Sequence, residues 1–205
     1  MTRIILVRHG QTEWNHVERF RGRANIPLNL KGLAQAEATG RRIASEWKPS
    51  AIYTSPLQRA ITTAEMIAIH FDLPVITHPN LIDIDYGQWQ GLTPHEVKER
   101  WPNMIEDWYK KPASLCIPEG ETLTDMRTRG MACVNTLVHR HKNQTIVMVG
   151  HTVINRMILL GVLGLGNECF WRLRQDTCAI NCFEAEDEIF TLVSLNDTCH
   201  LRSGF

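Results

Sequence analysis

Short runs of apolar residues, many of them β-branched, recur along the chain and predict buried strands. Ile4-Ile5-Leu6-Val7 predicts a strand over residues 3–8, and a similar run predicts another over residues 145–149. Four further runs predict short strands, at residues 51–53, 74–77, 179–184 and 189–195. The last two are expected to be joined by the acidic turn Ala185-Glu186-Asp187-Glu188.

Between these strands, apolar residues recur at helical spacing. The helices predicted in this way span residues 30–47, 55–71, 122–141 and 153–163. Strands that alternate with long helices predict an α/β fold, a three-layer α/β/α sandwich with a mostly parallel central sheet. Residues 1–205 are expected to form a single domain, with two short helices in an insertion at about 93–117.

Two further segments give local signals, of which the helix start at Ser55 and Pro56 is strong. Residues 81–91 alternate apolar and acidic side chains before several glycines, which predicts a strand fragment entering a loop. Ser55 and Pro56 predict a helix start, with Ser55 as N-cap and Pro56 in the first helical position. Arg59 would then lie in the first turn, where the helix dipole favours anion binding.

Composition narrows the class of protein. The 22 lysines and arginines balance the 22 aspartates and glutamates, which argues against a general nucleic-acid-binding face. The apolar stretch before Arg8 is too short for a signal peptide, and the longest apolar run, residues 157–166, is too short to span a membrane. We therefore expect a soluble cytoplasmic protein that does not bind membranes, with its oligomeric state open between monomer and homodimer.

The six cysteines show no paired C-x-x-C spacing, and without a secretion signal they are expected to be reduced thiols. No metal site is predicted from them.

Two of the predicted strands end in a histidine. Arg8-His9-Gly10 follows the first strand, and Gly150-His151-Thr152 follows the strand at 145–149. If these strands are parallel neighbours, both histidines lie at the same carboxyl edge of the sheet. With Arg8 and Arg59 they form a group of cations that is stable only around a polyanion, for which phosphate is the obvious candidate.

Five motifs occur in order along almost the whole chain. They are Arg8-His9-Gly10-x-Thr12-x-x-Asn15, Ser55-Pro56-Leu57-x-Arg59-Ala60, Leu81-x-Asp83-x-x-x-Gly87-x-Trp89-x-Gly91, Pro118-x-Gly120-Glu121 and Gly150-His151. In this order and at these intervals the sequence resembles the histidine phosphatase superfamily, in its phosphoglycerate-mutase-like branch. Within that branch it is similar to α-ribazole phosphatases and metal-independent phosphoserine phosphatases.

The resemblance implies a mechanism without metal or other cofactor. A neutral His9, with one ring nitrogen fixed by a hydrogen bond, attacks phosphorus, and water then hydrolyses the phosphohistidine. Arg8, Arg59 and a protonated His151 would neutralise the oxygens of the transferring group. The substrate-binding residues that it implies are Thr12, Asn15, Arg21, Glu121 and Thr152.

Proton donation to the leaving oxygen is implied for Asp83, although the family usually has glutamate there. Aspartate is one methylene shorter, so Asp85 and Glu13 remain alternatives for this role.

The mouth of the site is expected from residues 20–23 and 86–121, with Tyr86, Trp89 and Trp108 as candidates to line it. Trp171 is expected to serve packing instead.

The resemblance leaves two enzyme classes. Mutases of this branch carry a longer insertion with paired arginines, whereas residues 93–117 are compact and contain no Arg-Arg pair. We therefore expect a phosphatase acting on small-molecule phosphomonoesters, with phosphoglycerate mutase as the alternative. A non-catalytic phosphate-binding regulator is less favoured because His9, Arg8, Arg59 and His151 are all present. Phosphoserine, α-ribazole phosphate and phosphoglycerate all remain open as substrates.

Overall fold

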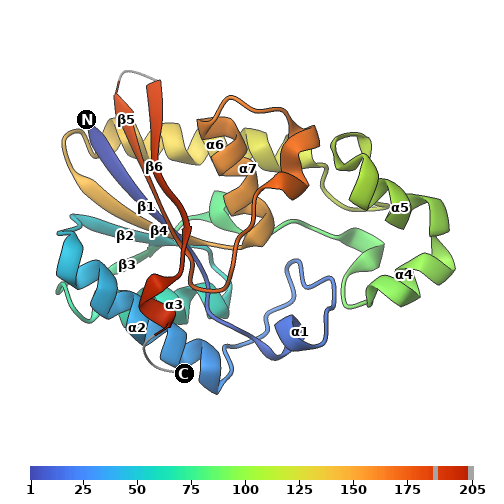
Figure 1. Cartoon of the computed structure of the whole chain (residues 1–205), viewed down its shortest axis with the longest axis horizontal. Coiled ribbons are helices and arrows are strands. Elements are labelled where there is room, and N and C mark those ends of the chain that lie inside the picture. Colours follow the sequence, from blue (N-terminus) through green and yellow to red (C-terminus); the bar gives the residue numbers. More distant parts are fainter. Residues whose placement is uncertain (187–188, 203–205) are drawn as a thin grey trace.

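A six-stranded sheet forms the centre of the computed structural model, which describes residues 1–186 and 189–202 (Figure 1). The strands are β1 (Thr2–Arg8), β2 (Ala51–Thr54), β3 (Val75–Thr77), β4 (Thr145–Gly150), β5 (Ile180–Glu186) and β6 (Ile189–Asp197). All six lie where the hydrophobic runs predicted them, within a few residues. The predicted acidic turn falls partly at residues 187–188, outside the described residues.

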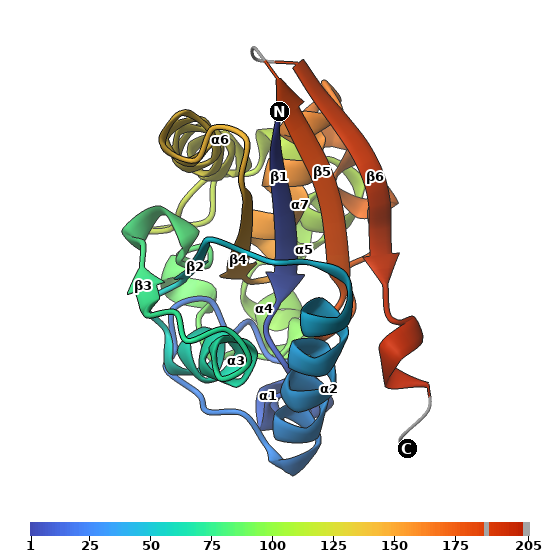
Figure 2. The same ribbon diagram turned by 90° about the vertical axis from the view of Figure 1, so that its left-hand side faces the viewer.

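The strand order is β3-β2-β4-β1-β5-β6, with β1 at the middle of the sheet (Figure 2). Strands β3, β2, β4 and β1 are parallel to one another, and β5 and β6 are antiparallel additions. Arg8 of β1 is paired with Gly150 of β4. The expectation that the two histidine-bearing strands are parallel neighbours is therefore confirmed.

Helices cover both faces of this sheet (Figure 2). Their bounds are α1 (Glu13–His16), α2 (Leu30–Glu46), α3 (Gln58–Ala68), α4 (Pro94–Arg100), α5 (Pro102–Lys110), α6 (Leu123–Arg140) and α7 (Thr152–Val162). In β1, Ile5 and Val7 join a core with α2 and α3, whereas Ile4 and Leu6 join a second core with α6 and α7. This alternation follows from the two-residue period of a strand and gives the predicted α/β fold its layers.

The insertion contains the two predicted short helices, α4 and α5. Thr93 caps α4, where its hydroxyl accepts a hydrogen bond from the Glu96 N–H (3.2 Å). Pro102 occupies the first turn of α5, a position where its missing N–H costs no hydrogen bond. The described residues contain no helix that is both long and apolar enough to cross a membrane.

Two local expectations were wrong. Helix α3 begins at Gln58 with Leu57 as N-cap, so neither Ser55 nor Pro56 starts it. The segment at 81–91 is not a strand: the 3₁₀ helices η1 (Pro79–Leu81) and η2 (Gly87–Trp89) flank an irregular stretch. Its carbonyls at Ile82 and Asp83 accept hydrogen bonds from the Arg129 side chain rather than from a neighbouring strand.

Candidate active site

The two predicted histidines meet at the carboxyl edge of the sheet. The ring centroids of His9, after β1, and His151, after β4, are 5.0 Å apart. Arg59, in the first turn of α3, lies between them: its Nε is 3.3 Å from His9 Nε2 and 3.2 Å from His151 Nδ1. All three side chains are buried, so this geometry is held by the interior of the protein.

Hydrogen bonds fix the form of both rings. His9 Nδ1 lies 2.6 Å from the carbonyl oxygen of Gly10, which can only accept, so Nδ1 carries the proton and Nε2 keeps its lone pair. His151 Nδ1 faces the Arg59 donor, so its proton lies on Nε2, 2.7 Å from Ser55 Oγ. The lone pair on His9 Nε2 is what a nucleophile requires.

Burial and the surrounding cations keep these rings neutral. Burial, then the charges of Arg59 and neighbouring groups, lowers the pKa of His9 well below its usual value of 6.5. Burial and Arg59 lower the pKa of His151 in the same direction. The expected protonated His151 therefore does not fit the ligand-free protein, because a dianion must arrive before a cation there is favourable.

The two predicted arginines are anchored by carbonyl groups. Arg59 donates to Ala24 O (2.6 Å) and Gly22 O (2.8 Å), which ties α3 to the loop after α1. Arg8 donates to Gln175 O (2.5 Å). Burial and the nearby charge of Arg21 lower the pKa of Arg8 to about 9, so it stays cationic at neutral pH.

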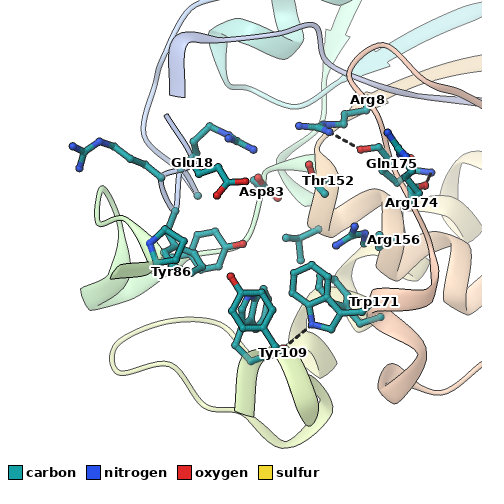
Figure 3. Close-up of a pocket in the computed structure, with 18 of the residues that line it drawn as sticks. Arg8, Glu18, Asp83, Tyr86, Tyr109, Thr152, Arg156, Trp171, Arg174 and Gln175 are labelled. Atoms are coloured by element: carbon teal, nitrogen blue, oxygen red, sulfur yellow. Dashed lines mark hydrogen bonds between the residues drawn. The ribbon is translucent and has the colours of Figure 1, made fainter. Parts of the chain in front are cut away.

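A pocket of about 430 Å³ is lined by Arg8 and Thr152, the chain neighbours of His9 and His151, although the two histidines are not part of its lining (Figure 3). Arg8, Asp83 and Thr152 line its inner end, where side chains are largely buried, and Tyr109 and Trp171 line its exposed end. Arg21 also lines it, as expected, and donates to Trp14 O (3.0 Å).

The Thr152 residue brings a helix terminus to this pocket. It is the first residue of α7, so its backbone N–H belongs to the unpaired amides of that helix end, a common binding place for phosphate.

Asp83 lines the pocket and lies close to Arg59. Its Oδ2 is 3.9 Å from Arg59 Nη2, and its buried Oδ1 has no hydrogen-bond partner among the described residues. Burial raises the pKa of Asp83, although the nearby arginines oppose this. A buried carboxyl group with a raised pKa beside an anion site is suited to donate a proton.

The two alternative acids do not line this pocket. Asp85 accepts a hydrogen bond from the Gly87 N–H (2.9 Å) and pairs with Arg23 (3.1 Å). Glu13 is exposed in α1. The structure therefore favours Asp83 over both.

Three predicted substrate-binding residues lie outside the pocket lining. Asn15 Oδ1 accepts hydrogen bonds from the backbone N–H and the hydroxyl of Thr12, both at 2.9 Å, which shapes the loop after His9. Glu121 accepts from Arg129 (2.9 Å) and pairs with Arg23 (3.1 Å). Burial alone would raise the pKa of Glu121, but these contacts lower it below its usual value.

Arg129, on α6, is a positioning residue that the sequence did not reveal. Its guanidinium donates to the carbonyl oxygens of Asn80 (2.8 Å), Ile82 (2.7 Å) and Asp83 (3.1 Å), and also to Glu121. It thus fixes the irregular backbone that carries the Asp83 carboxyl group. Nothing in the local sequence of α6 indicates such a distant set of acceptors.

The aromatic expectations were right for Tyr86 and Trp108, which line the pocket, and wrong for two others. Trp89 is fully buried and packs against Phe20, with ring centroids 5.1 Å apart. Trp171 lines the pocket and donates its Nε1–H to Trp108 O (2.7 Å).

Several pocket residues were missed, among them Tyr109, Arg156, Phe170 and Gln175. Only Arg156 had a usable signal, because it follows Thr152 by one helical turn.

Thiols and metal ligands add nothing to this site. All six cysteines are free. No group of three or more His, Cys, Asp and Glu side chains suited to a metal ion occurs in the described part of the chain.

A buried histidine pair at the edge of an α/β sheet, with flanking arginines and a buried carboxyl group, is typical of enzymes that act on phosphate esters. Residues 4–198 match the family model of the histidine phosphatase superfamily (branch 1). The chain belongs to this family, and it is a small-molecule phosphatase, a phosphoric monoester hydrolase. The mutase alternative is not favoured.

Known relatives of similar length support this assignment. Phosphoserine phosphatase 1 from Hydrogenobacter thermophilus is 34% identical over 201 residues, covering 98% of this chain and 95% of that protein. The metal-independent phosphoserine phosphatase from Arabidopsis thaliana is 33% identical over 208 residues, covering 100% and 86%. Among solved structures, a phosphoserine phosphatase mutant from Entamoeba histolytica in complex with phosphoserine has a TM-score of 0.88 at 27% identity, covering 98% of this chain and 100% of that chain.

Proposed function

We propose that this enzyme hydrolyses its phosphomonoester through a phosphohistidine at His9 Nε2. The observation that carries the proposal is the hydrogen bond from His9 Nδ1 to Gly10 O, which leaves the Nε2 lone pair directed toward the cations. In the first step the Nε2–P bond forms and the ester P–O bond breaks. Water then attacks phosphorus, the Nε2–P bond breaks, and inorganic phosphate leaves.

Asp83 supplies the proton that the leaving alcohol needs. Its raised pKa favours the protonated form, and a bound phosphate dianion raises it further. After donating to the ester oxygen, the Asp83 carboxylate takes a proton from the attacking water in the second step. The enzyme then returns to its starting protonation state.

The cations neutralise the charge of the transferring group. Arg8 and Arg59 carry permanent charge beside His9, and the Thr152 N–H adds the positive end of α7. His151 becomes cationic when the dianion binds, since the anion offsets the repulsion from Arg59. Together these groups supply the stabilisation that a metal ion provides in many other phosphoryl-transfer enzymes.

Phosphoserine is the first substrate to test. Two relatives of nearly the same length are named phosphoserine phosphatases, and a structural neighbour was solved with phosphoserine. The described pocket is of a size for such a small ester rather than for a macromolecule.

We also propose that the enzyme is a cytoplasmic, single-domain protein that binds neither nucleic acid nor membranes. The six free cysteines suit a reducing cytoplasm. Strand β1, from the start of the chain, lies between β4 and β5 from its second half, which supports a single domain. The balanced net charge supports a protein that binds neither nucleic acid nor anionic membranes.

The test is a rapid-quench experiment with ³²P-labelled phosphoserine in the presence of EDTA. We expect an acid-labile, base-stable label on the wild-type protein that forms and decays at rates consistent with turnover. His9→Ala should show no label and no phosphate release. His139→Ala, an exposed histidine on α6, is the matched control and should label normally. Turnover that stops with EDTA, or label retained in His9→Ala, would overturn the mechanism.

A further inference from the structure

The guanidinium group of Arg156, in the pocket wall, has no role in the mechanism proposed above. Arg156 lies on α7, one turn after Thr152, between Thr152 and Trp171 in the wall of the cavity (Figure 3). It lies over two aromatic rings, 4.8 Å from the centroid of Phe170 and 4.9 Å from that of Trp171.

The other arginines of this pocket have polar protein partners. Arg19 pairs with Glu96 (3.6 Å), and Arg174 pairs with Asp176 (2.9 Å). Arg8 and Arg21 each donate to a backbone carbonyl.

Within the described residues, Arg156 has neither an ion pair nor a hydrogen-bond acceptor, and its buried Nε is unpaired. Burying an ionised group without an anion is unfavourable, and contact with aromatic faces offsets only part of this. The missing partner is therefore expected from the ligand. A guanidinium has a flat fork of donors that matches the two oxygens of a carboxylate or of a phosphate.

The position of Arg156 sets the kind of ligand. The helix rises 1.5 Å per residue, so Arg156 lies about 6 Å along α7 from the Thr152 amide at the phosphate end. An ester whose second anionic group is about three to five bonds from the ester oxygen spans that separation. The intervening carbon atoms would lie against Tyr86 and Val153, which line the same cavity.

We propose that Arg156 is a specificity-determining residue that binds a second anionic group, a carboxylate or a phosphate, on the alcohol portion of the substrate. This inference rests on the proposed function, since it assumes that the reacting phosphate lies at Arg8, His9 and Thr152. It makes the preferred substrates short phosphomonoesters that carry two anionic groups. Stacking on Phe170 and Trp171 holds the guanidinium in place before the ligand arrives, which lowers the entropy cost of binding.

Matched substrates test this directly. Phosphoserine and O-phosphoethanolamine differ only by the carboxylate, and propane-1,3-diol bisphosphate and propyl phosphate differ only by the second phosphate. We expect the wild-type enzyme to favour phosphoserine, the bisphosphate, or both over the matched ester, by about 10- to 100-fold in kcat/KM. Which pair shows the larger ratio identifies the anion. Ratios near one for both pairs would overturn the proposal.

Variants of Arg156 assign the preference to this side chain. Arg156→Met keeps most of the packing and removes the charge. It should therefore abolish the preference for the ester with a second anionic group, mainly by raising KM for that ester. Its activity on O-phosphoethanolamine should stay within about threefold of wild type, because the inner end of the pocket is unchanged. Arg156→Lys should recover part of the preference, which a role in packing alone would not produce.

Arg172→Met is the control, since Arg172 is exposed in the 3₁₀ helix η4 (Asn167–Arg172) and does not line the pocket. Equal losses on both matched esters in Arg156→Met would show a structural role instead and contradict the proposal. If that variant does not fold, the wild-type ratios and Arg156→Lys still decide the question. Failure of the proposed function is separate, because it would appear as an absence of ³²P label on His9 with every ester.

Discussion

The two ends of the active site are built in different ways. The inner set, His9, Ser55, Arg59 and His151, follows or lies near the carboxyl ends of β1, β2 and β4, and hydrogen bonds among its members fix each side chain. The outer pocket is formed by residues of the loop before η2, the insertion, α7 and η4, namely Tyr86, Tyr109, Arg156, Phe170 and Trp171.

Aromatic packing, rather than a hydrogen-bond network, holds the outer pocket together. The ring centroids of Trp108 and Phe170 are 5.3 Å apart, as are those of Tyr109 and Trp171. Packed aromatic rings fix the shape of the outer pocket but give Arg156 no hydrogen-bond acceptor. We therefore expect the inner set to perform the chemistry on any phosphate ester and the outer pocket to select the alcohol. Variants of the inner set should lose turnover, and variants of the outer pocket should lose discrimination between substrate alcohols.

The largest effect should follow a change at the boundary between the two ends. Asp83→Asn removes the proton donor, so kcat for phosphoserine should fall about 10²- to 10⁴-fold. With p-nitrophenyl phosphate, whose leaving group needs no proton, the pre-steady-state burst should keep its rate within about tenfold. Stopped-flow absorbance measures the burst, and Asp85→Asn is the matched control. An equally slow burst would show that Asp83 is not the acid.

Arg59→Lys should reduce kcat/KM by about 10²- to 10³-fold for all esters alike. Lysine keeps the charge, but its single amine cannot reach both imidazoles and the carbonyls of Gly22 and Ala24 together. Steady-state assays with phosphoserine and p-nitrophenyl phosphate measure the loss, and thermal unfolding checks the fold. A loss confined to phosphoserine would instead show that Arg59 selects the alcohol portion of the substrate.

The pH profile should reflect the opposite shifts of two buried groups. Activity requires neutral His9, whose pKa is lowered, so kcat/KM should persist below pH 6.5 before it declines. Activity also requires protonated Asp83, whose pKa is raised, so kcat should fall about tenfold per pH unit above that pKa.

Asp83→Asn should therefore lose this alkaline decline, and profiles of both proteins on phosphoserine provide the measurement. An unchanged alkaline limb in the variant would assign the decline to another group.

Ser55→Ala should have the smallest effect in the inner set, a decrease of about tenfold in kcat. It leaves the buried His151 Nε2–H without its acceptor at 2.7 Å but keeps both nitrogens that face Arg59. Ser45→Ala, an exposed serine on α2, is the control in the same phosphate-release assay. A loss as large as that of Arg59→Lys would mean that Ser55 contacts the reacting group itself.

Much of this molecule followed from local patterns. The run Ile4–Val7 predicted a strand buried on both faces, and β1 is that strand because helices cover both sides of the sheet. Two such runs, each ending in a histidine, predicted that His9 and His151 meet, since parallel neighbours share one carboxyl edge. The helix predicted from residue 122 also begins there, with Thr122 as its N-cap, because a cap depends on residues only three positions away.

The remaining features depend on contacts between distant residues. Ser55 is a residue type that commonly caps helices, yet its hydroxyl lies 2.7 Å from Nε2 of His151, 96 positions later in the chain. Asp83 lies in a stretch with strand-like alternation, but Arg129 takes the carbonyls that a strand would pair.

The α/β fold, the histidine pair and the flanking arginines could be predicted from the sequence, because hydrophobic periodicity locates the strands and helices and these residues lie at their ends. The folded structure was needed to show the lowered pKa of His151, the burial that raises the pKa of Asp83, and the place of Arg156 on two aromatic rings. Burial and charge arise from every neighbour in space, and most of those neighbours are far away along the chain.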